Sequence, residues 1–271
     1  MCFMSPELLL RTVKEISREA GCIALSYFKD LKENNSTKKI DGSPLTNADV
    51  EVDAYIKNSL RSRTSYEQIL SEEDAVPYLK KGTYWVVDPI DGTQNFIEKN
   101  TAYAISIALV EDGVVTLGVV YAPSLGKTYA AAFGLGATCN DIPIMASVRT
   151  TLSGATVLLD NGTHERTVIF HSSIRKSLLD RGARTKAIEC ASLELVALSE
   201  GFYDGFVHRG LHAWDIAAGM VIAKESGILV LNLEGGAKSL FETGIVASTD
   251  TISPLLVSIT KQALDEEASA N

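Results

Sequence analysis

The sequence lacks the features that mark membrane, secreted and nucleic-acid-binding proteins. No stretch approaches the roughly 20 consecutive apolar residues that a membrane-spanning helix needs. Residues 1–10 lack a basic start, a long apolar run and a cleavage site, so we expect no signal peptide and a cytoplasmic location. The net charge is −9 and no basic run appears, which argues against a nucleic acid polymer as partner. The negative net charge is still compatible with an anionic substrate, because bound divalent metal ions would make the local electrostatic potential positive.

Cysteine is also scarce, with four residues and no paired spacing: Cys2, Cys22, Cys139 and Cys190. This scatter favours reduced thiols over a disulfide framework or a zinc site. The chain has 271 residues, of which 46% are hydrophobic, and a mean hydropathy of +0.10. Such a chain can bury a sizeable core, either as one large domain or as two fused lobes.

The first half of the chain predicts helices followed by an antiparallel sheet. Ser5-Pro6-Glu7 is typical of a helix start, and apolar residues at three- and four-residue steps extend that helix to about Phe28. We expect a loop from Lys29 to Pro44 and a second helix from Thr46. Strand patterns from Tyr103 to Ala132, interrupted by turn signals, predict an antiparallel meander.

Past Asn161 the pattern alternates between helices and short strands. Two stacked sheets, with helical layers between and outside them, fit both halves. We therefore expect an α+β fold in which residues 1–150 form helices plus the antiparallel sheet. Residues 151–271 form a smaller mixed α/β lobe, and the two lobes make one compact unit.

The most informative stretch runs from Trp85 to Thr93 and holds two aspartates three residues apart, Asp88 and Asp91. A buried strand leads into it, and we expect Pro89 and Gly92 to end that strand and turn the chain. If a helical turn begins at Thr93, two carboxylates and free backbone N–H groups form a place for a hard cation that carries a phosphate. The alternative is a solvated acidic turn.

Three further acidic positions allow both a structural and a functional interpretation. Asp49 follows Thr46 by three residues and is a capping-box partner. Glu72 stands in an acidic run after the expected strand Tyr66 to Leu70, where a solvated charge run is the simpler explanation. Asp215 opens the helix expected over Trp214 to Ser226, where an aspartate is commonly the N-cap.

Taken together, these segments resemble the inositol monophosphatase family of magnesium-dependent, lithium-sensitive phosphatases. The resemblance covers roughly Leu8 to Gly236. It depends on three acidic signatures in the same order: Glu72-Glu73, Asp88-Pro89-Ile90-Asp91-Gly92-Thr93 and Trp214-Asp215-Ile216-Ala217-Ala218-Gly219. It implies a layered αβαβα fold.

The resemblance also implies two to three Mg²⁺ ions. Their ligands would be Glu72, Asp88, the Ile90 carbonyl, Asp91 and Asp215. Catalysis would use Glu72 beside a metal-activated water, with Thr93 relaying a proton toward Asp49. The substrate would contact Asp91, Gly92, Thr93, Ala191 and His208. The implied partners are a small phosphorylated metabolite and a second copy of the chain in a homodimer.

Two positions in the expected substrate pocket depart from the family pattern. His208 stands where members acting on inositol phosphates carry a glutamate, and Glu189-Cys190-Ala191-Ser192 stands where a Gly-Ser or Gly-Thr pair is usual. His208 and Arg209 would suit a more anionic substrate, although His208 also fits an exposed strand end without a role. Inositol-1-phosphate is the first expected substrate. The alternatives are adenosine 3′,5′-bisphosphate, as for a 3′(2′),5′-bisphosphate nucleotidase, then histidinol phosphate or fructose-1,6-bisphosphate, and finally an idle relative that only binds or regulates.

Overall fold

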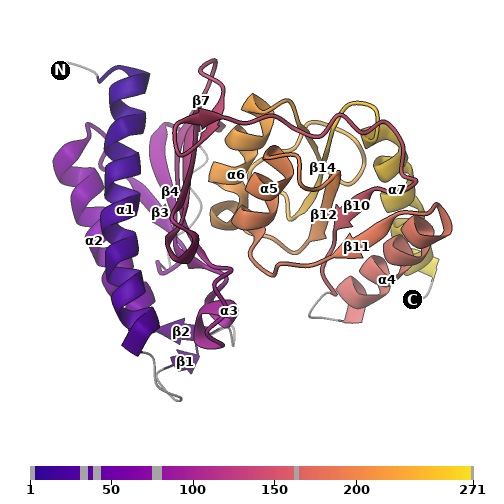
Figure 1. Cartoon of the computed structure of the whole chain (residues 1–271), viewed down its shortest axis with the longest axis horizontal. Coiled ribbons are helices and arrows are strands. Elements are labelled where there is room, and N and C mark those ends of the chain that lie inside the picture. The colour runs from indigo at the N-terminus through magenta and orange to yellow at the C-terminus, as the bar shows by residue number, and fades with distance from the viewer. Residues whose placement is uncertain (1–3, 31–35, 39–43, 75–80, 162–164, 270–271) are drawn as a thin grey trace.

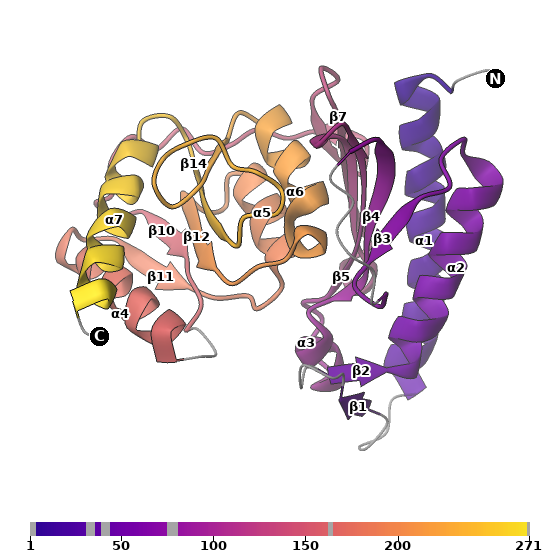
Figure 2. The same cartoon turned by 180° about the vertical axis from the view of Figure 1, so that it is seen from behind.

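The computed structural model describes residues 4–30, 36–38, 44–74, 81–161 and 165–269. Its elements form five layers in the order α, β, α, β, α, which Figure 1 shows from left to right and Figure 2 from behind. A seven-stranded sheet and a five-stranded sheet lie within these layers. The layered α+β sandwich expected from the sequence is therefore confirmed.

The first helical layer packs α1 (Pro6–Asp30) beside α2 (Asn47–Arg63) on one face of the larger sheet. The capping box expected at α2 is present. The Thr46 hydroxyl accepts from the Asp49 backbone N–H, and the Thr46 N–H donates to Asp49 Oδ2 over 2.8 Å. The loop expected between the helices instead contains two short antiparallel strands, β1 (Ser36–Lys38) and β2 (Pro44–Thr46). Residues 42 and 43 of its expected end lie outside the described residues.

The larger sheet has the strand order β3-β4-β5-β6-β7-β8-β9. The strands are β3 (Ile69–Ser71), β4 (Thr83–Asp91), β5 (Ala104–Glu111), β6 (Val114–Ala122), β7 (Lys127–Ala132), β8 (Ala137–Cys139) and β9 (Ile142–Pro143). The β5–β7 meander matches the prediction, whereas β8 and β9 were not expected. Only the β3–β4 pair is parallel among these described strands.

The second half builds the three remaining layers. The five-stranded sheet has the order β11-β10-β12-β14-β13. Its strands are β10 (Thr156–Leu158), β11 (Arg184–Lys186), β12 (Gly205–Arg209), β13 (Leu229–Leu231) and β14 (Gly244–Ser248). Helices α5 (Ala191–Ser199) and α6 (Ala213–Glu225) fill the space between the two sheets, and α4 (Glu165–Asp180) and α7 (Ser253–Ser269) cover the outer face. The prediction missed β14.

Small residues let α6 approach the larger sheet closely. A Cβ atom on Gly118 of β6 would lie 2.7 Å from the Ala218 carbonyl oxygen, so a larger residue there would push α6 away from the sheet. That separation would leave a gap in the close-packed core. This contact fixes the helix that carries Asp215 against the sheet that carries Asp88 and Asp91.

The end of β4 differs from the prediction. The strand continues through Pro89 to Asp91, and Gly92 follows it, with α3 (Thr93–Ile97) starting immediately afterwards. The pairing of β4 with β5 shifts register between Asp88 and Asp91. Because the ladder is interrupted there, the missing N–H of Pro89 costs no hydrogen bond. Both aspartates therefore flank an irregularity inside the strand rather than a turn after it.

No helix in the described part of the chain is both long enough and apolar enough to cross a membrane. Cys22, Cys139 and Cys190 are free thiols, in agreement with the expectation for these residues. Cys2 lies outside the described residues.

Candidate active site

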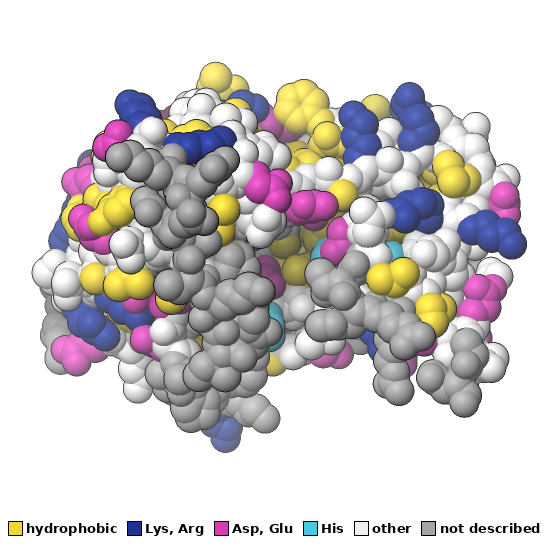
Figure 3. Space-filling view, turned by 90° about the horizontal axis from the view of Figure 1, so that it is seen from below, with side chains coloured by type: hydrophobic (Ala, Val, Ile, Leu, Met, Phe, Trp, Pro, Cys, Tyr) yellow, Lys and Arg dark blue, Asp and Glu magenta, His cyan; other side chains and the backbone are white. Residues whose placement is uncertain are grey.

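A cavity of about 560 Å³ brings most of the predicted site residues together. Its lining includes Glu72, Asp91, Gly92, Thr93, Ala191, His208 and Asp215. Figure 3 shows acidic and histidine side chains at the hollow between the two halves of the molecule. Asp88 and Ile90 are buried and do not line the cavity, and Asp49 is fully buried at the start of α2.

Backbone N–H groups orient the three aspartates of this site. Ile90 N–H donates to Asp88 Oδ1 over 3.1 Å, and Ser192 N–H donates to Asp91 Oδ2 over 2.7 Å. His212 N–H donates to the Asp215 Oδ2 atom over 2.7 Å. Asp215 occupies the third position of α6, so the prediction that it is the N-cap was wrong. In each aspartate, one carboxylate oxygen thus accepts a hydrogen bond from a backbone N–H group.

Glu72 joins these aspartates through the β3–β4 pair. Its N–H donates to the Val87 carbonyl oxygen over 3.1 Å, which places Glu72 beside the residue that precedes Asp88. Ser71, the last residue of β3, donates its hydroxyl to Asp53 of α2. The acidic run is therefore anchored at this end, not a freely solvated segment.

A buried ion pair supports the same turn from α2. The Lys57 Nζ atom lies 2.5 Å from Asp53 Oδ2 and 2.7 Å from Asp74 Oδ1. The exposed fractions of Lys57 and Asp53 are 9% and 8%. Lys57, Asp53 and Asp74 form a largely buried ion-pair network, which fixes the positions of its side chains more firmly than a surface ion pair does. This network holds the turn that carries Glu72 on helix α2.

The four carboxylates repel one another. Burial, followed by the charges of Glu72, Asp91 and Asp215, raises the pKa of Asp88 well above its ordinary value. Burial also raises the pKa of Asp91, although hydrogen bonds from Ser192 and Cys190 offset part of that effect. Such a group is electrostatically costly unless protons or cations balance it.

The donor set fits a hard divalent cation. Four carboxylates and the Ile90 carbonyl are all oxygen ligands, which Mg²⁺ prefers. Within the described ranges, no three acidic, histidine or cysteine side chains already surround a single point as ligands. The fit therefore follows from the chemistry of the donors and from their mutual repulsion, not from preformed coordination.

Gly92 and Thr93 shape the floor of the cavity beside the aspartates. Gly92 has a φ of +83°, and a Cβ atom there would lie 2.9 Å from the Ala102 carbonyl oxygen and 3.1 Å from Cys190 Cβ. Only glycine satisfies both constraints. The Thr93 hydroxyl donates to the Ile90 carbonyl oxygen over 3.0 Å. The relay from Thr93 to Asp49 stays a prediction.

The opposite wall combines His208, which the sequence analysis named, with residues that it did not. His208 lies within β12, its side chain is 15% exposed and its Nε2 atom is 2.6 Å from Asp160 Oδ2, so it is not the exposed side chain of the alternative interpretation. Its role in substrate binding stays a prediction. The other Asp160 oxygen lies 2.6 Å from Nδ1 of His171 in α4, which is fully buried. Asp160, Glu189 and Glu194 also line the cavity. No local motif marks these side chains, because distant segments bring them together.

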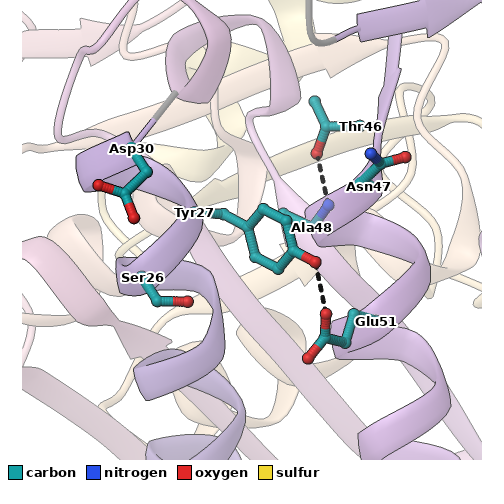
Figure 4. A pocket seen from close by; sticks show the side chains of 7 residues that line it. All are labelled: Ser26, Tyr27, Asp30, Thr46, Asn47, Ala48 and Glu51. Atoms are coloured by element: carbon teal, nitrogen blue, oxygen red, sulfur yellow. Dashed lines mark hydrogen bonds between the residues drawn. The ribbon is translucent and has the colours of Figure 1, made fainter. Parts of the chain in front are cut away.

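A second cavity, of about 370 Å³, opens between the end of α1 and the start of α2. Figure 4 shows its lining, in which Tyr27 donates its hydroxyl to Glu51 and Thr46 accepts from Ala48. Apart from Thr46, which caps the helix of Asp49, its described lining contains none of the residues discussed above. It is therefore separate from the acidic cavity.

Within the layered α+β fold, Glu72, Asp91 and Asp215 line one rim of the cavity, and buried Asp88 interacts with all three. A cluster of oxygen ligands beside a glycine-threonine pair is the kind of site that a metal-dependent phosphatase needs. A sequence model described as the inositol monophosphatase family matches residues 6–265. The chain belongs to this family, whose members are phosphoric monoester hydrolases.

Individual relatives cover nearly the same extent. A Thermotoga maritima protein named fructose-1,6-bisphosphatase/inositol-1-monophosphatase is 32% identical over 82% of this chain and 84% of its own length. A Neisseria meningitidis protein named putative Nus factor SuhB is 30% identical over 90% of this chain and 94% of its own. The solved structure of a Thermotoga maritima IMPase superposes with a TM-score of 0.86 at 29% identity, covering 95% of this chain and 98% of that one.

Proposed function

We propose that the protein hydrolyses a small phosphate monoester with bound Mg²⁺, and that inositol-1-phosphate is its first substrate. One observation carries the proposal. Three separate segments of the chain supply four interacting carboxylates, of which Glu72, Asp91 and Asp215 line one cavity next to Gly92 and Thr93.

Glu72, Asp88, Asp91, Asp215 and the Ile90 carbonyl would hold two to three Mg²⁺ ions. When bound, these ions lower the pKa of a water and neutralise charge on the attacking and leaving oxygens. Backbone N–H groups orient three of these carboxylates in the absence of an ion. The donors are Ile90 for Asp88, Ser192 for Asp91 and His212 for Asp215. Preorganised ligands of this kind need little rearrangement during the reaction.

The remaining residues bind phosphate and move the proton. The N–H groups of Gly92 and Thr93 donate to phosphate oxygens, because glycine lets the backbone approach the ligand closely. The Thr93 hydroxyl turns from the Ile90 carbonyl, takes the proton of the attacking water and passes its own proton toward Asp49. Thr46 holds the Asp49 carboxylate through its N–H and its hydroxyl, at 2.8 and 2.6 Å. Glu72 orients the attacking water.

Phosphate release from a substrate panel, with and without millimolar Mg²⁺, tests the proposal. The panel contains inositol-1-phosphate, adenosine 3′,5′-bisphosphate, histidinol phosphate and fructose-1,6-bisphosphate. We expect Mg²⁺-dependent release that is fastest from inositol-1-phosphate, and inhibition of that release by lithium. No turnover of any phosphomonoester would overturn the assignment and favour a binding or regulatory role.

We also propose a homodimer in the cytoplasm, as family resemblance implies. Light scattering of the purified chain at micromolar concentration tests the dimer, for which we expect twice the chain mass of 29.2 kDa. A mass equal to one chain would refute it.

A further inference from the structure

A buried asparagine joins three backbone segments beside the acidic cavity. Asn95 belongs to α3 and is 4% exposed. Its Nδ2 atom donates to the carbonyl oxygens of Ala102, Ile188 and Glu189, over 2.8, 2.9 and 3.2 Å. Ile188 and Glu189 lie in the connection between β11 and α5, residues 187–190, which we call the α5 loop. One side-chain amide therefore links α3 to the loop that leads into α5.

The orientation of this amide is fixed from its other side. Asn100 Nδ2 donates to Asn95 Oδ1 over 2.9 Å, and the Ala102 N–H donates to Asn100 Oδ1 over 3.1 Å. Because the oxygen of the Asn95 amide accepts from Asn100, its nitrogen faces the three carbonyl oxygens. Removing this buried donor would take a hydrogen bond from groups that lie away from water, which is costly. The amide thus holds the α5 loop in one position.

The α5 loop contains a backbone conformation that favours glycine. Glu189 has a φ of +61°, in the left-handed region. A residue with a Cβ atom is disfavoured there by roughly five- to thirtyfold in population. The hydrogen bonds from Asn95 to the carbonyls of Ile188 and Glu189 lie on both sides of this residue, and the Ile188 N–H donates to Glu194 over 2.7 Å. These contacts offset the unfavourable conformation of Glu189.

The conformation of this loop determines where α5 begins. Cys190 is the N-cap of α5 and follows Glu189 directly. Two donors at this helix start bind the same oxygen, Asp91 Oδ2: the Ser192 N–H over 2.7 Å and the Cys190 thiol over 3.2 Å. Rotation of the Glu189 backbone would move both donors away from Asp91. The left-handed residue is therefore mechanically connected to a predicted metal ligand.

Asp91 is one of four carboxylates that would hold Mg²⁺, which we call the metal rim: Glu72, Asp88, Asp91 and Asp215. We propose that Asn95 is a positioning residue of this rim, because it holds Glu189 in its left-handed conformation and so keeps the start of α5 on Asp91. Asn95 acts through the α5 loop and binds neither substrate nor metal. The consequence for catalysis rests on the proposed function, whereas the position of the loop can be measured without any reaction.

Alkylation of Cys190 by iodoacetamide, followed by mass spectrometry of its peptide, measures release of the α5 loop in the metal-free chain. Cys190 is 1% exposed, so the reagent reaches it only when the loop opens. Asn95→Ala should raise its alkylation rate about tenfold, as the cost of a left-handed non-glycine residue implies. Cys139 of β8, which is 8% exposed, should keep its rate. Asn58→Ala, the same change at an exposed position of α2, is the matched control and should leave both rates unchanged.

Glu189→Gly tests whether Asn95 acts through the backbone of residue 189. Glycine adopts the left-handed region about as readily as the right-handed one, so the loop then depends less on the amide. In the Glu189→Gly background, Asn95→Ala should raise the rate of Cys190 alkylation by less than about threefold. An asparagine that only stabilises the fold would give the same increase in both backgrounds. Equal increases would overturn the inference.

Calorimetric titration with Mg²⁺ tests the consequence for the metal rim. Residues that orient metal ligands typically change affinity by about tenfold or more, so Asn95→Ala should weaken Mg²⁺ binding by about that factor. Turnover should fall at low Mg²⁺ and recover as Mg²⁺ is raised, with the substrate KM at saturating Mg²⁺ unchanged. Glu189→Gly should restore much of the Mg²⁺ affinity to the double variant. Release of Cys190 with an unchanged Mg²⁺ isotherm would refute the role of Asn95 at the rim.

A second variant covers the case in which Asn95→Ala does not fold. Asn100 is exposed, and Asn100→Ala withdraws the hydrogen bond that orients the Asn95 amide. We expect a smaller rise in Cys190 alkylation, of about threefold, for the loss of that bond.

The outcomes separate the two proposals. An unchanged Cys190 rate in these variants, or a parallel rise for Cys190 and Cys139 that reports general loosening of the fold, would overturn the inference. A wild type that hydrolyses no phosphomonoester would overturn the proposed function. In that case the alkylation of Cys190 would still decide whether Asn95 holds the α5 loop.

Discussion

The two walls of the acidic cavity are built in different ways. At the metal rim, main-chain N–H groups hold Asp88, Asp91 and Asp215, and a local sequence signature marks each position. At the opposite wall, side chains hold side chains, and Asp160 depends on histidines from two other elements. Because main-chain N–H groups do not depend on the side chain of the donor residue, substitutions of those donors should leave the rim aspartates in place. At the opposite wall, substitution of one histidine removes a contact to Asp160. The difference explains how one fold can keep its chemistry while its substrate changes.

The largest effect should come from the rim. We expect Asp91→Asn to lower turnover by about 10³-fold or more, since several kcal/mol of transition-state stabilisation depend on the ligands of the metal. The Ser192 N–H can still donate to the amide oxygen of asparagine, so the fold should persist. Phosphate release and a thermal melt measure the two quantities. Turnover near the wild-type rate would refute the assignment of Asp91 as a metal ligand.

We expect a smaller loss of turnover from removing the Thr93 hydroxyl, which is proposed to transfer a proton and does not bind a metal ion. Thr93→Ala removes the hydroxyl and keeps the backbone N–H. Loss of one general acid–base group costs about 10²-fold, so kcat should fall by that factor with little change in KM. Thr93→Ser, which retains a hydroxyl, is the matched control and should keep most of the activity. Equal rates for the alanine and serine variants would exclude the relay through Thr93.

The third effect lies at the opposite wall, and it appears in stability and not in activity. Burial raises the pKa of Glu194 to about 7, although the Ile188 N–H bond opposes that shift. The pKa of Glu194 is higher in the folded than in the unfolded state. Its contribution to the free energy of unfolding is therefore fully present below pH 4.5 and is lost as the pH rises to about 7. Glutamine cannot ionise and keeps the bond from Ile188.

Glu194→Gln should therefore match the wild type near pH 4.5 and exceed it at pH 8, by an upper limit of about 3 kcal/mol. Denaturant unfolding in metal-free buffer at both pH values measures this difference. Glu67→Gln, the same change at an exposed position, is the matched control. A Glu194→Gln advantage that is the same at both pH values would show that Glu194 does not titrate in this range.

Much of the local structure around the rim could be predicted because its signals are local. Thr46 and Asp49 form the expected capping box, and α3 begins at the expected Thr93. The errors also have local causes. Pro89 was expected to end β4, but the register shift removes the need for its N–H, so the strand continues to Asp91.

The opposite wall could not be predicted in the same way. Asp160 and His171 are eleven residues apart, and His208 lies further along the chain, with no spacing that marks a shared site. Their contacts depend on the pairing of β10 with β12 and on the packing of α4 outside that sheet. His208 was identified only as a departure from a family pattern, and the pattern gave no indication of its partner.

Direct Mg²⁺ binding tests the central claim, that the four rim carboxylates form a metal centre. Calorimetric titration of the substrate-free chain with Mg²⁺ should show saturable binding in the wild type and in the control variant Asp250→Asn, which changes an exposed turn. Asp91→Asn should lose at least one class of site. Identical isotherms for wild type and Asp91→Asn, or no binding by the wild type at millimolar Mg²⁺, would contradict the claim.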